Sequence, residues 1–295
     1  MSDFQLSCCS AADLSEAYFK ERDIIYLSFH FELDGKDYPD DLGKTISAAE
    51  LFRRMDAGST TKTSQVTINE YTDYFRGVLS DGRDLLHVTL SSGLSGTYNS
   101  AMIAKEIVEE EYPDRKIFVL DSLAASSGFG LLVDKLADMR DAGIGIEEVY
   151  QWGEEHKLNL HHWFFSTDLT YYIRGGRVSR TAGAIGTMLN ICPLLNVDFE
   201  GHLIPREKVR TKKKVLRRTV EKMLQFADDG KDYSGRVFIS HSLCEEDARE
   251  LLRMVEEKFP KIDGPIHLFS IGATIGSHTG PGTVALFFWG SKRTD

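Results

Sequence analysis

The sequence predicts an α/β protein of two domains, and two observations support this. In the first half, short apolar runs alternate with amphipathic stretches, which is typical of strands joined by helices in a mainly parallel sheet. In the second half, the strand-like segments are aromatic and no longer alternate regularly with helices, which favours a mixed or antiparallel sheet. A length of 295 residues suits two modest domains or one large one.

The first half has three apolar runs that we predict to be strands, at residues 24–27, 85–90 and 116–120. Helical periodicity follows at residues 48–55, 97–110 and 130–140. Helices of this length between strands cover both faces of a parallel sheet. We therefore expect residues 1–160 to form a three-layer α/β/α domain.

The second half, residues 161–295, is predicted to be an α/β domain of a different kind. Strands are expected at residues 163–165, 237–239, 266–269 and 284–289, and helices at 212–227 and 245–258. A further helix, at 147–158, is expected to end the first half. Ser242 and Glu245 have the spacing of a capping box at the start of the last helix.

Composition excludes several classes of function. The formal net charge of −10 repels phosphate backbones, so we expect no nucleic-acid partner. The apolar runs are too short to span a bilayer, which predicts no stable membrane insertion and leaves transient membrane contact open. With no signal-like start, a cytoplasmic location is expected. The cysteines have no CxxC spacing, which predicts free thiols and no metal site: Cys8, Cys9, Cys192 and Cys244.

The strongest local feature is the segment from Leu90 to Thr97, which joins a predicted strand to a predicted helix. Ser92, Gly93, Ser95 and Gly96 give it hydroxyl donors and a tight turn at a helix N-terminus. The pattern favours an anion site at the carboxyl end of a strand. Ordinary helix capping is the alternative.

Two other segments offer polar groups of the same kind. Residues 60–67 hold five hydroxyls, including Thr63 and Ser64, and form either a polar loop or the polar end of a pocket. Near the C-terminus, His278 lies among four glycines and a proline in residues 272–282. It can donate to an anion, or it can be satisfied by a local turn.

Basic residues gather in two further segments. Arg177 lies in residues 172–178, and eight basic residues, including Arg210, lie between 206 and 218. The second segment is either a solvated helix face or a docking patch for an acidic partner or a phosphate.

Taken together, these segments resemble the DegV family, whose characterised members bind lipids and include the fatty-acid-binding subunit of bacterial fatty acid kinase. Five motifs match in order and cover the chain from about residue 9 onward: TSQ at 63–65, LSSxLSGT at 90–97, DS at 121–122, GGR at 175–177 and HTGPG at 278–282. A KxR motif matches residues 208–210.

The resemblance implies two α/β domains with a long-chain fatty acid bound between them in an apolar tunnel. It implies that Thr63, Ser95 and His278 hold the carboxylate, with Ser64, Ser92, Gly93 and Gly96 supporting the turn. Arg177 and Arg210 match arginines that work with a separate kinase, which uses ATP to convert the carboxyl group to an acyl-phosphate. The carrier itself has no catalytic residue and no cofactor. A family member that binds lipid without a kinase partner is the alternative.

One position departs from the family pattern, which has an aspartate in the turn after the first strand. Alignment on Asp13 places Cys9 at that aspartate, and the first strand, residues 4–7, is expected to be short.

Two rival functions remain. The first is a serine esterase with Ser95 as nucleophile and His278 as base, although G-x-S-x-G is not satisfied and no orienting acid is identifiable. The second is a nucleic-acid-binding or regulatory protein that uses residues 206–218, which the net charge disfavours.

Overall fold

A parallel four-stranded sheet forms the centre of the first half of the chain. The structure, a computed structural model, describes residues 4–179 and 191–294. The strand order is β2-β1-β6-β7, and every pair is parallel. The strands are β1 (Phe4–Cys9), β2 (Ile24–Leu27), β6 (Asp84–Thr89) and β7 (Ile117–Asp121). The predicted strands are confirmed, and β1 extends two residues beyond the short strand expected.

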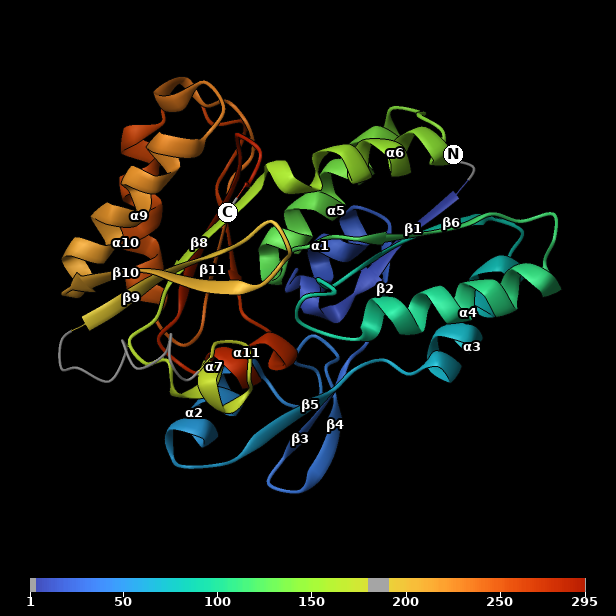
Figure 1. The fold of residues 1–295 in the computed structure, drawn as a ribbon, viewed down its shortest axis with the longest axis horizontal. Helices are drawn as coiled ribbons and strands as arrows, with labels where there is room; N and C mark the ends of the chain where they lie inside the picture. The colour runs from blue at the N-terminus through green and yellow to red at the C-terminus, as the bar shows by residue number, and fades with distance from the viewer. Residues whose placement is uncertain (1–3, 180–190, 295) are drawn as a thin grey trace.

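Helices cover both faces of this sheet, as Figure 1 shows. α3 and α4 pack against each other and against β6 and β7, while α5 and α6 contact β1, β6 and β7. These helices are α1 (Glu16–Glu21), α3 (Ile68–Ser80), α4 (Thr97–Glu111), α5 (Ser126–Asp141) and α6 (Ile146–His156). The α/β/α layering predicted for this half is therefore present.

A six-stranded mixed sheet forms the second half, in the order β10-β9-β8-β13-β11-β12. Among the described strands of this sheet, only β11 and β12 pair in parallel. Its strands are β8 (Leu160–Phe165), β9 (Ile191–Val197), β10 (Leu203–Arg210), β11 (Phe238–His241), β12 (His267–Ser270) and β13 (Val284–Trp289). The helices α9 (Lys212–Phe226) and α10 (Glu245–Lys258) cover one side, and α5 packs against the sheet as well.

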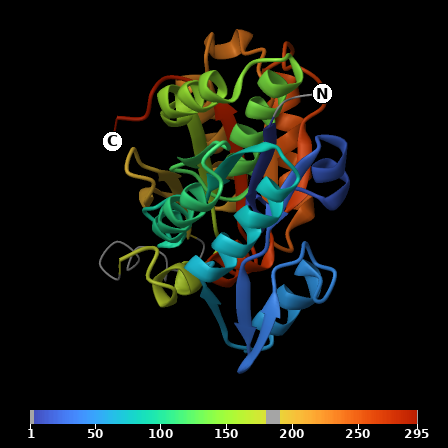
Figure 2. The same cartoon turned by 90° about the vertical axis from the view of Figure 1, so that its right-hand side faces the viewer.

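A small antiparallel sheet, in the order β4-β3-β5, was not predicted. It projects from the bottom of the molecule in Figure 2. The sheet consists of β3 (His30–Leu33), β4 (Lys36–Pro39) and β5 (Thr61–Ser64). Beside it lie three short helices, α2 (Ala48–Asp56), α7 (Thr170–Arg174) and α11 (Ala273–Thr279), of which α11 contacts the other two and β3 and β5. The polar segment around Thr63 is thus a strand.

The capping box expected at Ser242 and Glu245 is wrong. The N-cap of α10 is Cys244, without a side-chain cap, and Ser242 Oγ instead accepts a hydrogen bond from Thr283 N at 2.9 Å. Ser242 therefore joins the start of α10 to the segment before β13.

The domain division at residues 160 and 161 stays a prediction. The strands of the parallel sheet end at residue 121 and those of the mixed sheet begin at 160. Between them, α5 contacts strands of both sheets, so this helix binds the two halves together. None of the described helices has the length and apolarity that a membrane crossing requires.

Candidate functional site

A cavity of about 300 Å³ brings the three main predicted site residues together. Thr63 on β5, Ser95 in the turn after β6 and His278 on α11 all line it, and so do Ser64 and Gly96. The other wall is largely apolar and includes Phe29, Leu90, Leu94, Phe164, Val197, Leu203, Ile271, Ile275, Ala285 and Phe287. The cavity thus has the two kinds of surface that an amphipathic ligand needs.

His278 is held at the cavity wall by contacts from two other segments. Its Nε2 is hydrogen-bonded to Thr63 Oγ1 at 2.7 Å. A side-chain carbon at Gly175, just after α7, would collide with His278 Nδ1, so the imidazole fits only because this residue is a glycine. Burial and the positive charge of Arg177 lower the pKa of His278 to about 4, which makes the ring neutral at pH 7.

Two buried polar atoms on α11 have no hydrogen-bond partner among the described residues. They are His278 Nδ1 and Thr279 Oγ1, and both residues line the cavity. Buried polar groups are nearly always paired, so unpaired ones beside a cavity indicate that a ligand or water completes their bonding.

The turn that carries Ser95 is built by the ends of two neighbouring strands. Leu94 N and Ser95 N donate to Ser91 O at 3.0 and 3.2 Å. Asp121, the last residue of β7, accepts a hydrogen bond from Ser92 N at 3.1 Å. Ser92 itself is exposed and does not line the cavity, so it supports the turn from outside.

The tip of the β9–β10 hairpin clamps this turn from the other side. Ser91 Oγ donates to Gly201 O at 2.9 Å, and a side-chain carbon at Gly93 would lie 2.7 Å from Glu200 O. Gly93 is therefore needed for close approach of two backbones. The turn is fixed by both halves of the chain.

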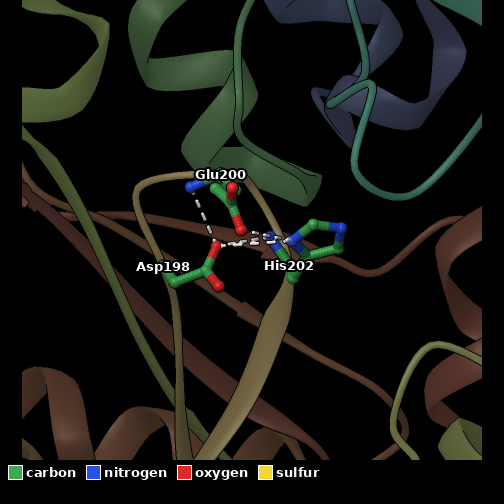
Figure 3. Close-up of side chains that lie close together, drawn as sticks. All are labelled: Asp198, Glu200 and His202. Atoms are coloured by element: carbon green, nitrogen blue, oxygen red, sulfur yellow. Dashed lines mark hydrogen bonds and ion pairs between the residues drawn. The ribbon is translucent and has the colours of Figure 1, made fainter. Parts of the chain in front are cut away.

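Three side chains gather at that hairpin tip, as Figure 3 shows: Asp198, Glu200 and His202. Their potential ligand atoms lie within 4.8 Å of one another, but Glu200 and His202 are exposed. Asp198 Oδ1 accepts hydrogen bonds from Glu200 N and His202 N at 3.0 and 2.8 Å. This bonding shapes the hairpin tip, and that is the role the geometry supports.

Arg177 lines the cavity, although the sequence assigned it only to a partner protein. Its Nη1 and Nη2 donate to Gly175 O at 2.6 Å and Leu94 O at 3.0 Å, and burial lowers its pKa. Among the described residues that line the cavity, it is the one with a permanent charge. Arg210, by contrast, is exposed at the end of β10 and does not line the cavity.

Two buried carboxylates that the sequence did not identify as site residues lie beside the cavity. Asp13 accepts hydrogen bonds from Gly272 N at 2.9 Å and from Ser126 Oγ at 2.6 Å. Asp40 accepts from both the backbone N and Oγ1 of Thr274, at 3.0 and 2.6 Å. They hold the start of α11, and burial raises the pKa of each. In the sequence, Asp13 served only to align the chain with the family pattern, and Asp40 lies in a loop with no recognisable motif.

The geometry gives no support to a serine esterase. Ser95 Oγ accepts a hydrogen bond from Thr97 N at 3.3 Å, and His278 bonds to Thr63. No hydrogen bond joins Ser95 to His278 within the described structure, and no carboxylate there orients the imidazole. The relay that activates a nucleophilic serine is therefore missing from the residues described.

Comparison with known proteins identifies the family of this chain. The DegV family model matches residues 9–290 of the chain. The chain belongs to the DegV family. A DegV domain-containing protein of Clostridium perfringens is 38% identical over 293 residues, which cover 99% of each protein.

Solved structures of DegV family proteins share the fold over the whole chain. A Thermotoga maritima protein whose structure reveals fatty acid binding function is 28% identical to this chain, with a TM-score of 0.85. The match covers 99% of this chain and 100% of that protein. The fatty acid kinase B3 protein of Streptococcus pneumoniae, loaded with linoleic acid, is 23% identical to this chain, with a TM-score of 0.85. The match covers 99% of this chain and 100% of that protein. At that identity it shows the shared DegV fold alone.

Proposed function

We propose that this DegV family protein binds a long-chain fatty acid in the cavity, with the carboxylate at Thr63, Ser95 and His278. The observation that supports this best is the combination of those three side chains with Arg177 in an otherwise largely apolar cavity. A protein with a net charge of −10 needs a local positive field to hold an anion, and Arg177 supplies it. Hydroxyl and imidazole donors then replace the water lost by the carboxylate.

The acyl chain supplies most of the affinity. Burial of about 14 methylene groups at roughly 0.8 kcal/mol each contributes on the order of 11 kcal/mol before ordering costs. The polar groups fix which end of the ligand lies where. The Thermotoga relative, with fatty acid binding function at 28% identity, supports the same ligand class.

The test is extraction of natively purified protein followed by mass spectrometry. We expect about one fatty acid per chain in the wild type. Ser95→Ala is expected to retain less fatty acid and to bind added oleate more weakly, by about tenfold or more, because a hydrogen bond to a charged group is lost.

Ser92→Ala is the matched control, because Ser92 lies in the same turn but is exposed and does not line the cavity. It is expected to bind oleate like the wild type. Wild-type protein that carries no lipid and takes up neither oleate nor palmitate would rule out the proposed function.

We further propose that the bound fatty acid is presented to a separate ATP-dependent kinase, which converts it to an acyl-phosphate. The match of residues 208–210 to the family's KxR motif supports this, and so does the exposure of Arg210. A fatty-acid carrier with no kinase partner is the alternative, and an assay of acyl-phosphate formation with the kinase separates the two.

Substitutions of Arg210 and Arg177 are expected to affect different steps. Arg210→Ala should bind oleate normally but lower the rate of acyl-phosphate formation with the kinase, because its side chain lies outside the cavity. Arg177→Ala should weaken oleate binding about tenfold or more, because the cation beside the head group is removed.

Arg249→Ala provides the control for surface charge, since Arg249 is an exposed arginine on α10 paired with Glu245. It is expected to change neither binding nor transfer. If Arg210→Ala and Arg249→Ala support equal transfer rates, Arg210 has no part in partner recognition.

A further inference from the structure

A buried polar network lies directly behind the Ser95 turn and is not part of the cavity wall. It joins Cys9 at the end of β1, Tyr71 on α3, His87 on β6 and Thr97 at the start of α4. Tyr71 Oη is hydrogen-bonded to Thr97 Oγ1 at 2.9 Å and to Cys9 Sγ at 3.3 Å. Cys9 Sγ also lies 3.6 Å from His87 Nε2. All four side chains are fully buried.

The network carries no charge at neutral pH. Burial raises the pKa of Cys9 to about 12 and lowers that of His87 to about 3, and burial also raises the pKa of Tyr71. It therefore works through hydrogen bonds alone. A buried network whose members are satisfied is rigid, because breaking one bond leaves a polar atom unpaired.

Thr97 connects this network to the head-group turn. Its backbone N–H donates to Ser95 Oγ at 3.3 Å, while its own hydroxyl is held by Tyr71. A serine oxygen accepts through its lone pairs and donates through its single hydrogen. Once Ser95 Oγ accepts from Thr97, its hydrogen is free to be donated to an anion in the cavity.

We propose that Tyr71 is a positioning residue for the carboxylate site and acts through Thr97 on the Ser95 hydroxyl. This inference rests on the proposed fatty-acid function. Tyr71 does not line the cavity, so it touches no ligand. It fixes the first residue of α4, and that residue fixes the direction in which Ser95 donates.

The same network contains the position at which the chain departs from the family pattern. Cys9 stands where the resemblance places an aspartate, and its thiol is bonded to Tyr71. An uncharged group at this point lets β1 contribute to the order of the turn without adding a negative charge behind a carboxylate site. The turn is therefore held by neutral hydrogen bonds.

A second branch of the network supplies a matched control. Ser7 Oγ is hydrogen-bonded to His87 Nδ1 at 2.9 Å and to Tyr74 Oη at 2.8 Å. Tyr74 lies on the same helix as Tyr71, one turn away, and its hydrogen bond leads to Ser7 on β1 and not to Thr97. Tyr→Phe at either position removes one hydroxyl from the network, but only Tyr71 reaches the turn.

The test compares Tyr71→Phe with Tyr74→Phe in the full chain, with oleate and oleyl alcohol as ligands. Tyr71→Phe is expected to weaken oleate binding about fivefold to tenfold and to leave oleyl alcohol binding unchanged, because only the carboxylate requires the oriented donor. Tyr74→Phe is expected to bind both ligands like the wild type. Melting temperatures of the two variants show whether their effects on stability are similar.

Thr97→Val gives a second, independent variant, because it removes the hydroxyl that Tyr71 holds and keeps the shape. It should reproduce the loss for oleate, and the double variant with Tyr71→Phe should lose no more than either single one. Equal losses in Tyr71→Phe and Tyr74→Phe, or equal losses for both ligands, would overturn the inference. Wild-type protein that fails to bind oleate would instead overturn the proposed function on which it rests.

Discussion

His278 is neutral at pH 7, and this makes its protonation part of the proposed ligand binding. Burial and Arg177 hold its pKa near 4, so a proton added to the imidazole would lie beside another positive charge. A carboxylate bound between Arg177 and His278 opposes both effects and raises the pKa. Between the two pKa values the complex holds one more proton than the free protein.

The affinity for an anionic ligand that stays ionised is therefore expected to rise as pH falls through the pKa of the complex, by at most about tenfold per unit, and to level off below about pH 4. Dissociation constants of a long-chain alkyl sulfonate from pH about 8 to about 5 measure this, because sulfonate stays ionised throughout. His278→Gln keeps a donor that does not titrate and should flatten the profile. An unchanged profile in this variant would assign the proton to another group.

At the scale of the element, the position of α11 depends on two buried carboxyl groups. Asp13 and Asp40 hold its first residues, and this short helix carries Thr274, His278 and Thr279 to the cavity. The pKa of Asp13 is raised well above its ordinary value, first by burial and further by the charge of Asp40, although its bond from Ser126 opposes this. The folded protein therefore keeps the Asp13 proton to a higher pH than the unfolded chain does.

Asp13 therefore makes the stability of the fold depend on pH. Its contribution to the free energy of unfolding is fully present below its unfolded pKa of about 4 and is lost as pH rises through the folded pKa. Asp13→Asn should remove that part of the pH dependence, which is measured by urea unfolding across the same range. Asp114→Asn, at an exposed position, is the control. Parallel curves for wild type and Asp13→Asn would show that Asp13 does not titrate with unfolding.

Element prediction succeeded where the apolar pattern was marked and failed where an element is short and has few apolar positions. The helices at α4, α9 and α10 were predicted almost to the residue, because their periodicity extends over several turns. The strands β3, β4 and β5 have four residues each, and of the three only β3 has buried positions, while α11 has seven residues. Tertiary packing decides such short elements, so local sequence could not.

At the scale of the whole molecule, the residues of the candidate site were identifiable but their contacts were not. Family motifs named Thr63, Ser95 and His278 from three distant segments, and the structure places all three on one cavity. Arg177 was named too, yet its place beside His278 depends on the fit of the imidazole against Gly175. Asp40 and Tyr71 carry no motif, and only the packing of β1, α3 and α11 shows what they hold.

The residues that line the cavity come from nearly the whole length of the chain, and this decides when the protein can acquire the proposed ligand. The lining runs from Phe29 to Phe287, and β13, which contributes Ala285 and Phe287, pairs between β8 and β11 inside the mixed sheet. A growing chain on the ribosome can form the parallel sheet early, since its strands are complete by residue 121. It cannot close the cavity until residues near 287 have been synthesised. In the proposed function, lipid loading therefore follows translation of nearly all of this chain, and a stalled or truncated product would expose the apolar wall of the cavity without a ligand to cover it.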